Sequence, residues 1–210
     1  MIDIDILLTW GACYKKVKAG EIIFFEGSSC NFYYQVVEGR IKWVNINEEG
    51  KEYLQQLIEP NDCFGELPLF DGGKYAATAI AEVDSLIIRL HQSSFHQLIA
   101  ENSTLHFKFS KHLAERLRFK FHVLKEMAHH DPEKRIGALL NYLKEQQQNI
   151  CPKCSQVKLT RQQIGDMCGL RVETVIRAMR FMHERGEINI TKGKVYLRDM
   201  TQIIQKPCSK

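Results

Sequence analysis

The sequence contains no run of about 18 apolar residues, the length that a membrane-spanning helix needs. Its first segment, MIDIDILLTWGACYKK, lacks the basic start and long apolar stretch of a signal peptide. Neither internal repeats nor low-complexity segments occur. We therefore expect a cytoplasmic protein. Its seven cysteines, an odd number without an export signal, are expected to be reduced thiols.

Patterns typical of catalysis or of a bound metal are also scarce. No nucleophile–base pair and no complete set of metal ligands stands out, so we expect no enzyme, no metal site and no certain cofactor. An iron–sulfur cluster normally needs four thiolates, whereas the N-terminal end offers only Cys13 and Cys30, which are far apart, and Cys63 follows later in the predicted barrel. Four histidines without compact ligand spacing are predicted to lie mainly on helix surfaces: His91, His96, His106 and His112.

One pair of cysteines has a spacing used in known metal and redox sites. Cys151 and Cys154 form a lone CxxC, which can bind zinc or form a redox pair. Zinc would need two more ligands, for which Cys168 and His183 are the nearest candidates. The simpler interpretation is a loop turn with two free thiols.

Charge is distributed unevenly along the chain. Residues 1–130 carry 14 Lys and Arg against 17 Asp and Glu, a net charge of −3. Residues 131–210 carry 15 against 8, a net charge of +7. A basic C-terminal module is expected of a protein that binds the phosphate backbone of nucleic acids.

Short apolar runs alternate with Gly-, Asn- and Asp-containing turns over residues 15–98. Strands separated by turns every ~8–12 residues predict a small antiparallel barrel or sandwich, which can enclose one small ligand. The predicted strands are Ile22–Phe25, Tyr33–Val37, Arg40–Asn45, Glu52–Leu57, Ala76–Ala81 and Ser85–Leu90.

Residues 103–129 contain neither Pro nor Gly and predict one helix about 40 Å long. Because a small barrel does not need so long a cover, the pattern favours a two-stranded coiled coil and a homodimer. The alternative is a helix packed only on its own barrel. Lys120 is unusual in such a seam and is expected to set the register or to contact a ligand. The predicted seam is Phe109, Leu113, Leu117, Lys120, Leu124 and Met127.

Residues 159–185 predict two short helices joined by a tight turn. Thr160 is suited to cap the first helix, and Gly169 can adopt the left-handed backbone of a sharp turn. A helix in this position, with polar residues on its outer face, is typical of DNA major-groove readers. Its predicted buried side is Val172, Val175, Ile176, Met179 and Met182, and its predicted exposed side is Arg171, Glu173, Thr174, Arg177 and Arg180.

Flanking segments complete this module. Asp131 and Pro132 predict a helix start, and the junction before them predicts a domain boundary and hinge.

Glu173 and Arg177 lie four residues apart, so they can reach adjacent base pairs. Glu accepts a hydrogen bond from cytosine and Arg donates two to guanine. The alternative is a surface ion pair. A β-hairpin wing follows, and its Lys192 and Lys194 are expected to contact phosphates.

Five segments along the chain share a pattern with a known family. They are VKAGEIIFFEG at 17–27, Tyr33–Ile41, Phe64–Phe70, Thr160–Gly165 and Glu173–Arg177. In this order they resemble the CRP/FNR superfamily of bacterial transcription regulators. The resemblance implies an α+β protein with an N-terminal double-stranded β-helix jelly roll, a long dimerisation helix and a C-terminal winged helix-turn-helix. The expected domains are a cyclic-nucleotide-binding-like β-roll sensor at 1–102, the dimerisation helix and hinge at 103–130, and the DNA-binding domain at 131–210.

The resemblance also implies where an effector would bind. In the cyclic-nucleotide binders of the family, the Glu of a Gly-Glu-Leu cassette binds a ribose hydroxyl, and Glu66 matches it. The Arg and Ser that hold the cyclic phosphate fall on Ala76 and Ala77, so cyclic AMP in its usual pose is not expected. Glu66 can equally be a capping or structural carboxylate. The expected effector-site residues are Gly65, Glu66, Leu67, Ala76, Ala77, Thr78, Lys120 and Phe121.

We therefore expect a regulator controlled by an unidentified small-molecule effector. Its expected partners are a palindromic double-stranded DNA site, a second copy of the chain through residues 103–130 and RNA polymerase, with no membrane. Two alternatives remain: a ligand-independent regulator with a vestigial sensor barrel, or a thiol or metal sensor acting through Cys151 and Cys154. The expected DNA-binding residues are Arg161, Arg171, Glu173, Thr174, Arg177, Lys192 and Lys194.

Overall fold

The computed structural model describes residues 1–127 and 131–197. The chain divides into two compact units, Met1–Leu117 and Arg118–Lys210. Across the described ranges, no helix combines the length and the apolar character that crossing a membrane requires.

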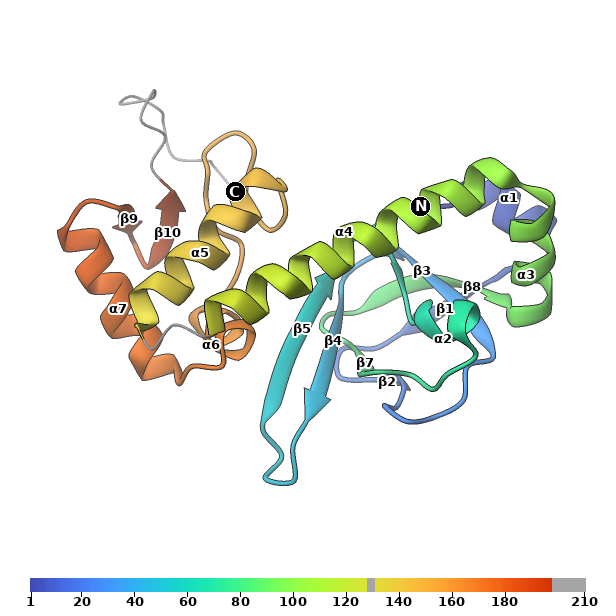
Figure 1. Cartoon of the computed structure of the whole chain (residues 1–210), viewed down its shortest axis with the longest axis horizontal. Coiled ribbons are helices and arrows are strands. Elements are labelled where there is room, and N and C mark those ends of the chain that lie inside the picture. Colours follow the sequence, from blue (N-terminus) through green and yellow to red (C-terminus); the bar gives the residue numbers. More distant parts are fainter. Residues whose placement is uncertain (128–130, 198–210) are drawn as a thin grey trace. The chain divides into compact units, whose positions relative to one another are not determined.

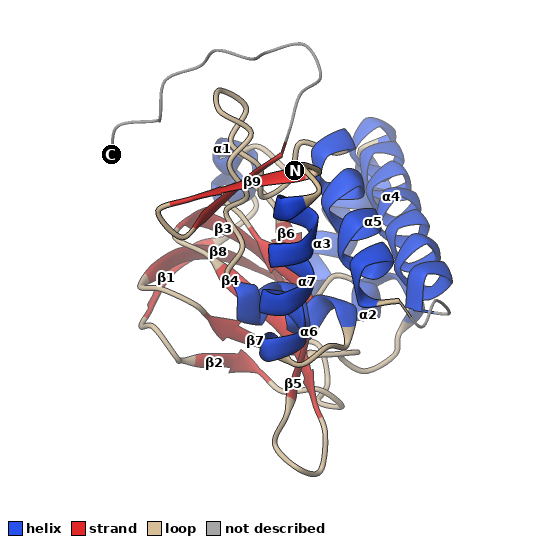
Figure 2. Ribbon diagram, turned by 90° about the vertical axis from the view of Figure 1, so that its left-hand side faces the viewer, coloured by secondary structure: helices blue, strands red, loops and turns tan. Residues whose placement is uncertain are grey.

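The first unit is built on two four-stranded antiparallel sheets (Figures 1 and 2). Their strand orders are β1-β8-β3-β6 and β2-β7-β4-β5. Apart from β4 and β5, which are consecutive, neighbours in each sheet are distant in the sequence, as in the expected jelly roll. The strands are β1 (Cys13–Val17), β2 (Ile22–Phe24), β3 (Phe32–Glu38), β4 (Ile41–Ile46), β5 (Glu52–Ile58), β6 (Cys63–Phe64), β7 (Thr78–Ala81) and β8 (Ser85–His91); the short helices are α1 (Ile4–Thr9), α2 (Leu67–Asp71) and α3 (Gln92–Glu101).

Two of these strands were not predicted, and one begins later than expected. Strand β1 is mostly exposed and lacks a clear alternation of buried and exposed residues, while β6 is only two residues long. Strand β7 begins at Thr78, because Ala76 and Ala77 precede the ladder that β7 forms with β4. The remaining predicted strands are present with ends that differ by one residue.

Helix α4 (Ser103–Met127) has two different faces. On one face, Phe109 is 1% exposed and packs edge-on against Tyr33 of β3, with ring centroids 5.9 Å apart. Phe109 therefore belongs to the core of the first unit, and its assignment to an interchain seam is wrong. Another face carries residues spaced alternately three and four apart, all exposed: Phe107, Ser110, Ala114, Leu117, Phe121 and Leu124. We call these six residues the α4 stripe.

The described part of the second unit contains the end of α4, three further helices and a hairpin, which are α5 (Pro132–Glu145), α6 (Arg161–Cys168), α7 (Val172–Glu184), β9 (Ile188–Thr191) and β10 (Lys194–Leu197). Asp131 caps α5 by accepting a hydrogen bond from the Glu133 amide, with Pro132 at the first helical position, as predicted. Helix α7 packs against both α5 and α6. Residues 128–130 of the predicted hinge lie outside the described residues.

Candidate DNA interface and barrel site

Local hydrogen bonds fix the start of α6 and the turn that follows it. The hydroxyl of Thr160 accepts from the Gln163 amide at 3.1 Å, and the Gln163 side chain accepts from the Thr160 amide at 2.8 Å. This reciprocal capping satisfies two backbone donors at the helix end. After α6, Gly169 has φ of +66°, a conformation that costs glycine little. Both predictions, the cap and the glycine turn, are confirmed.

Helix α7 separates a buried face from an exposed polar face. Val175, Met179 and Met182 are at most 4% exposed and pack inside the unit. Ile176 was predicted to be buried, but it is 44% exposed. It lies three residues after Glu173 on the outer face, because one residue advances a helix by about 100°. The exposed polar side chains of this face are Arg171, Glu173, Arg177 and Arg180.

The remaining predicted DNA-binding residues also lie in the second unit. Arg161 is the first residue of α6 and is half-buried. Thr174 is half-buried on α7. Lys192 and Lys194 are exposed at the turn between β9 and β10, where Lys192 has a φ of +49°. The wing hairpin is confirmed by the antiparallel pairing of β9 with β10.

The CxxC segment forms a turn beside the wing. The Cys151 amide donates to the Gln156 carbonyl at 2.8 Å, and Gln156 bridges to β10. Cys151 and Cys154 are both half-buried. The two further residues considered as zinc ligands, His183 and Cys168, differ in their surroundings. His183 lies 3.3 Å from a backbone carbonyl of β9, and burial raises the pKa of Cys168 to about 12.

In the first unit, Glu66 is fully buried and forms an ion pair with Arg116 of α4. The Arg116 guanidinium also donates to the Cys63 carbonyl at 2.6 Å and lies 5.6 Å from the Trp43 ring centroid. Burial opposes the charge of Arg116, yet the Glu66 carboxylate raises the pKa of Arg116 above its usual value. Glu66 makes no side-chain cap to α2, so the capping interpretation is wrong, whereas its ion pair with Arg116 fits a structural carboxylate.

His112 lies beside this pair rather than on an open helix surface. It is half-buried on the barrel-facing side of α4. Burial, followed by the charge of Arg116, lowers the pKa of His112 to about 4. The prediction of a surface histidine is therefore wrong for His112. The signal for His112 and Arg116 was their spacing from Phe109, three and seven residues on respectively, which places all three on one side of a helix.

The segment that follows α2 contributes no charged side chain to this site. Ala76 is exposed and Ala77 is 3% exposed. The Thr78 hydroxyl accepts a hydrogen bond from the Glu26 amide at 3.0 Å. Gly65 has a φ of +69° and no room for a Cβ atom beside Phe24. Leu67 begins α2.

Lys120 and Phe121 are exposed and belong to the second unit. Phe121 is also part of the α4 stripe.

Comparisons with known proteins agree with this organisation. The family model of the cyclic nucleotide-binding domain matches residues 14–102, and that of the Crp-like helix-turn-helix domain matches residues 134–205. The cAMP-activated global transcriptional regulator CRP of Salmonella typhimurium is 28% identical over 176 residues, which are 83% of this chain and 84% of that protein. The protein of the same name from Pasteurella multocida is 29% identical over 192 residues, covering 89% and 92%.

Solved structures share the fold. FixK2 from Bradyrhizobium japonicum superposes with a TM-score of 0.75 at 22% identity, covering 90% of this chain and 93% of that one. A CooA mutant from Carboxydothermus hydrogenoformans superposes with a TM-score of 0.78 at 17% identity, covering 93% and 87%. The two family models, their order along the chain and the curated relatives identify a transcription regulator rather than an enzyme. The chain belongs to the CRP/FNR superfamily of DNA-binding transcription regulators.

Proposed function

We propose that this protein is a homodimeric, effector-responsive regulator that reads a palindromic DNA site with α7. The observation that carries this proposal is the exposed face of α7, where Glu173 and Arg177 stand side by side opposite a fully buried apolar face. A helix held in this way can enter the major groove while the rest of its unit stays packed.

The chemistry of that face suggests a division of roles. Arg177 can donate two hydrogen bonds to guanine, and Glu173 can accept one from cytosine. Arg171 and Thr174 lie at the start of the same helix, within reach of the groove. Arg161, Lys192 and Lys194 sit at a helix start and on the wing, where cations typically contact phosphates. These seven residues are our proposed DNA interface.

Dimerisation through residues 103–130 is supported by the α4 stripe. Its large side chains are strongly exposed, from 56% for Leu117 to 73% for Phe107. Residues spaced alternately three and four apart form the a and d positions of a two-stranded coiled coil. A dimer of this kind would present two copies of α7 to half-sites about 34 Å apart. RNA polymerase is the further partner we propose.

The proposed sensor domain is residues 1–102, and the proposed DNA-binding domain is residues 131–210. An effector bound near Glu66 would bias α4, because Arg116 joins that carboxylate to the helix. Coupling between two such sites typically amounts to about 1–3 kcal/mol. The named relatives are cAMP-activated. In this chain Ala76 and Ala77 stand at the phosphate positions, so we propose an effector other than cAMP in that pose.

Selection of binding sites from randomised duplex DNA tests the assignment, using the full chain without added effector. We expect a palindrome containing the family's G–A element. Glu173→Ala should relax one base position, with a loss of discrimination of about 1–3 kcal/mol. Glu184→Ala, an exposed carboxylate at the other end of α7, serves as the matched control and should leave the site unchanged. Equal effects of both substitutions would contradict base reading by Glu173.

A further inference from the structure

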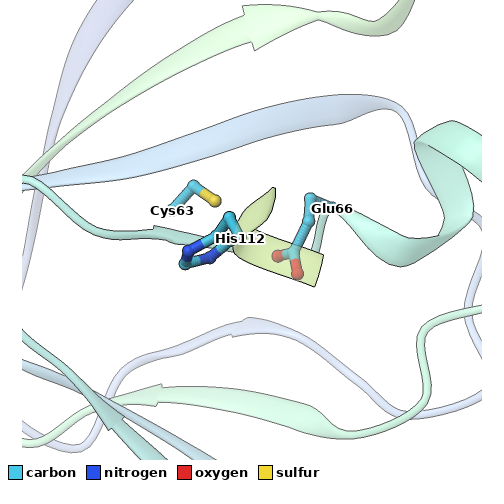
Figure 3. Close-up of side chains that lie close together, drawn as sticks. All are labelled: Cys63, Glu66 and His112. Atoms are coloured by element: carbon cyan, nitrogen blue, oxygen red, sulfur yellow. The ribbon is translucent and has the colours of Figure 1, made fainter. Parts of the chain in front are cut away.

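Three side chains with metal-binding donors converge inside the first unit (Figure 3). Cys63 comes from β6, Glu66 precedes α2, and His112 comes from α4. Their donor atoms, one sulfur, one carboxylate oxygen and one imidazole nitrogen, all lie within 4.8 Å of one another. Among the side chains that the structure describes, no other group of three His, Cys, Asp or Glu residues has such spacing.

Two of the donor groups have a buried atom without a hydrogen-bond partner. These atoms are Oε2 of Glu66 and Nε2 of His112. Glu66 is fully buried, and Cys63 is also 0% exposed. A buried polar atom left unpaired destabilises the fold, and more so when it belongs to a charged group. Natural cores rarely keep such atoms without a reason.

We propose that Cys63, Glu66 and His112 bind one divalent transition-metal ion of the zinc class. Sulfur, imidazole nitrogen and carboxylate oxygen are the ligands that Zn²⁺ takes. With metal–ligand bonds of about 2.0–2.3 Å, neighbouring donors in a tetrahedral site lie roughly 3.3–3.8 Å apart. The three donor atoms lie within 4.8 Å of one another, so small side-chain rotations would bring them to these distances. Three protein ligands leave a fourth position open for water or another small ligand.

Arg116 supports the site without occupying it. Its guanidinium binds Oε1 of Glu66 and the Cys63 carbonyl, which leaves Oε2 for the metal. Such outer-shell partners orient the ligands. Because the charges of Glu66 and Arg116 cancel, the net charge of the occupied site comes from the metal ion and the Cys63 thiolate. Binding displaces the Cys63 thiol proton, which passes to solvent. Nε2 of His112 has no hydrogen-bond partner, so this ring nitrogen is available to the ion.

The placement gives the ion a mechanical role. Two ligands belong to the β sandwich and the third belongs to α4, so a bound ion would join the helix to the sandwich. An effect of the metal on DNA binding rests on the proposed function, since it requires α4 to couple the barrel to α7. The metal site itself does not depend on that coupling.

A cobalt titration of the full chain tests the site after treatment with a chelator. Co²⁺ replaces zinc in tetrahedral sites and gives a near-ultraviolet thiolate-to-cobalt absorption band, which Zn²⁺ should abolish. We expect the band in the unchanged chain and in the Cys151→Ser/Cys154→Ser variant. Cys63→Ser should remove the band, and His112→Gln should weaken Co²⁺ binding at least about 10-fold. Cys30→Ser, a buried thiol of the same unit, is the matched control and should retain it.

Opposite results would overturn the assignment. A band that survives Cys63→Ser, or one that disappears in the Cys151→Ser/Cys154→Ser variant, places the metal elsewhere. Absence of any band in the unchanged chain also refutes the site. If circular dichroism shows that Cys63→Ser is unfolded, His112→Gln decides, because His112 is only half-buried. DNA binding is measured separately with and without Zn²⁺. Failure of the cobalt test therefore leaves the regulator assignment intact.

Discussion

At the scale of single residues, the buried pair of Glu66 and Arg116 is the most consequential contact in the first unit. The sequence predicted a functional or structural role for Glu66 from the Gly-Glu-Leu pattern. It gave no role to Arg116, because the two residues are 50 positions apart. Local patterns carry no information about which distant side chain will meet a buried carboxylate. The same reason explains why the group formed by Cys63, Glu66 and His112 was not predicted.

The buried pair predicts a specific pattern of stability changes. Arg116→Met leaves the fully buried Glu66 carboxylate without its partner, so the free energy of unfolding should fall by about 3–5 kcal/mol. The double variant Glu66→Gln/Arg116→Met removes both charges and should lose clearly less than Arg116→Met alone. Urea denaturation in the presence of a chelator measures both, and the chelator excludes any contribution from metal. Glu66→Gln alone completes the cycle. If the losses of Glu66→Gln and Arg116→Met simply add in the double variant, the two side chains are not coupled.

Ile176 shows a different limit of sequence analysis at the residue scale. Apolar side chains are usually buried, and the run Val175-Ile176 allows either residue to face the core. Because each residue advances the helix by about 100°, Val175 falls on the buried stripe of α7 and Ile176 falls outside it. The exposed Ile176 then lies beside Glu173 on the proposed DNA-reading face.

At the scale of secondary-structure elements, local signals decided which predictions succeeded. The cap at Thr160, the turn at Gly169 and the start of α5 at Asp131 rest on side chains and backbone within four residues. All three were predictable for that reason. Strand β6 is two residues long and is held by its pairing with β3, which no local pattern records.

Helix α4 was predicted in length but not in orientation. The predicted seam and the α4 stripe share Leu117 and Leu124, but the seam also included Phe109, which faces the core. Both sides of the helix carry apolar residues at heptad-like spacing. Sequence alone therefore could not tell which side packs on the barrel and which is left exposed.

The α4 stripe predicts the oligomeric state. Leu117→Glu places a charge at a d position of the proposed coiled coil, where burial without a partner is costly. We expect the mass measured by sedimentation equilibrium to shift from dimer toward monomer, with the dissociation constant rising at least about 10-fold. Lys108→Glu, an exposed position of α4 outside the stripe, should leave the dimer intact. A Leu117→Glu variant that remains dimeric at the same concentrations would exclude the stripe as the interface.

At the scale of the whole molecule, the basic and acidic residues are unevenly divided between the N-terminal and C-terminal parts of the chain. The predicted architecture of jelly roll, long helix and winged helix-turn-helix is confirmed. It was predictable because each part has its own periodicity and because the basic excess lies in residues 131–210. What could not be predicted is the polar interior of the first unit, since it depends on contacts between strands, loop and helix.

The basic module predicts how DNA binding depends on salt. If Arg161, Lys192 and Lys194 contact phosphates in both protomers, six phosphates are neutralised, and the slope of log Kobs against log salt should be about −5. Lys192→Ala removes two of these contacts, so its slope should be shallower by about 2, with base preference unchanged. Glu173→Ala should do the reverse, changing base preference while its slope stays near that of the unchanged chain. Fluorescence anisotropy at a series of salt concentrations gives both quantities. If the Lys192→Ala slope equals that of the unchanged chain, Lys192 of the wing does not contact a phosphate.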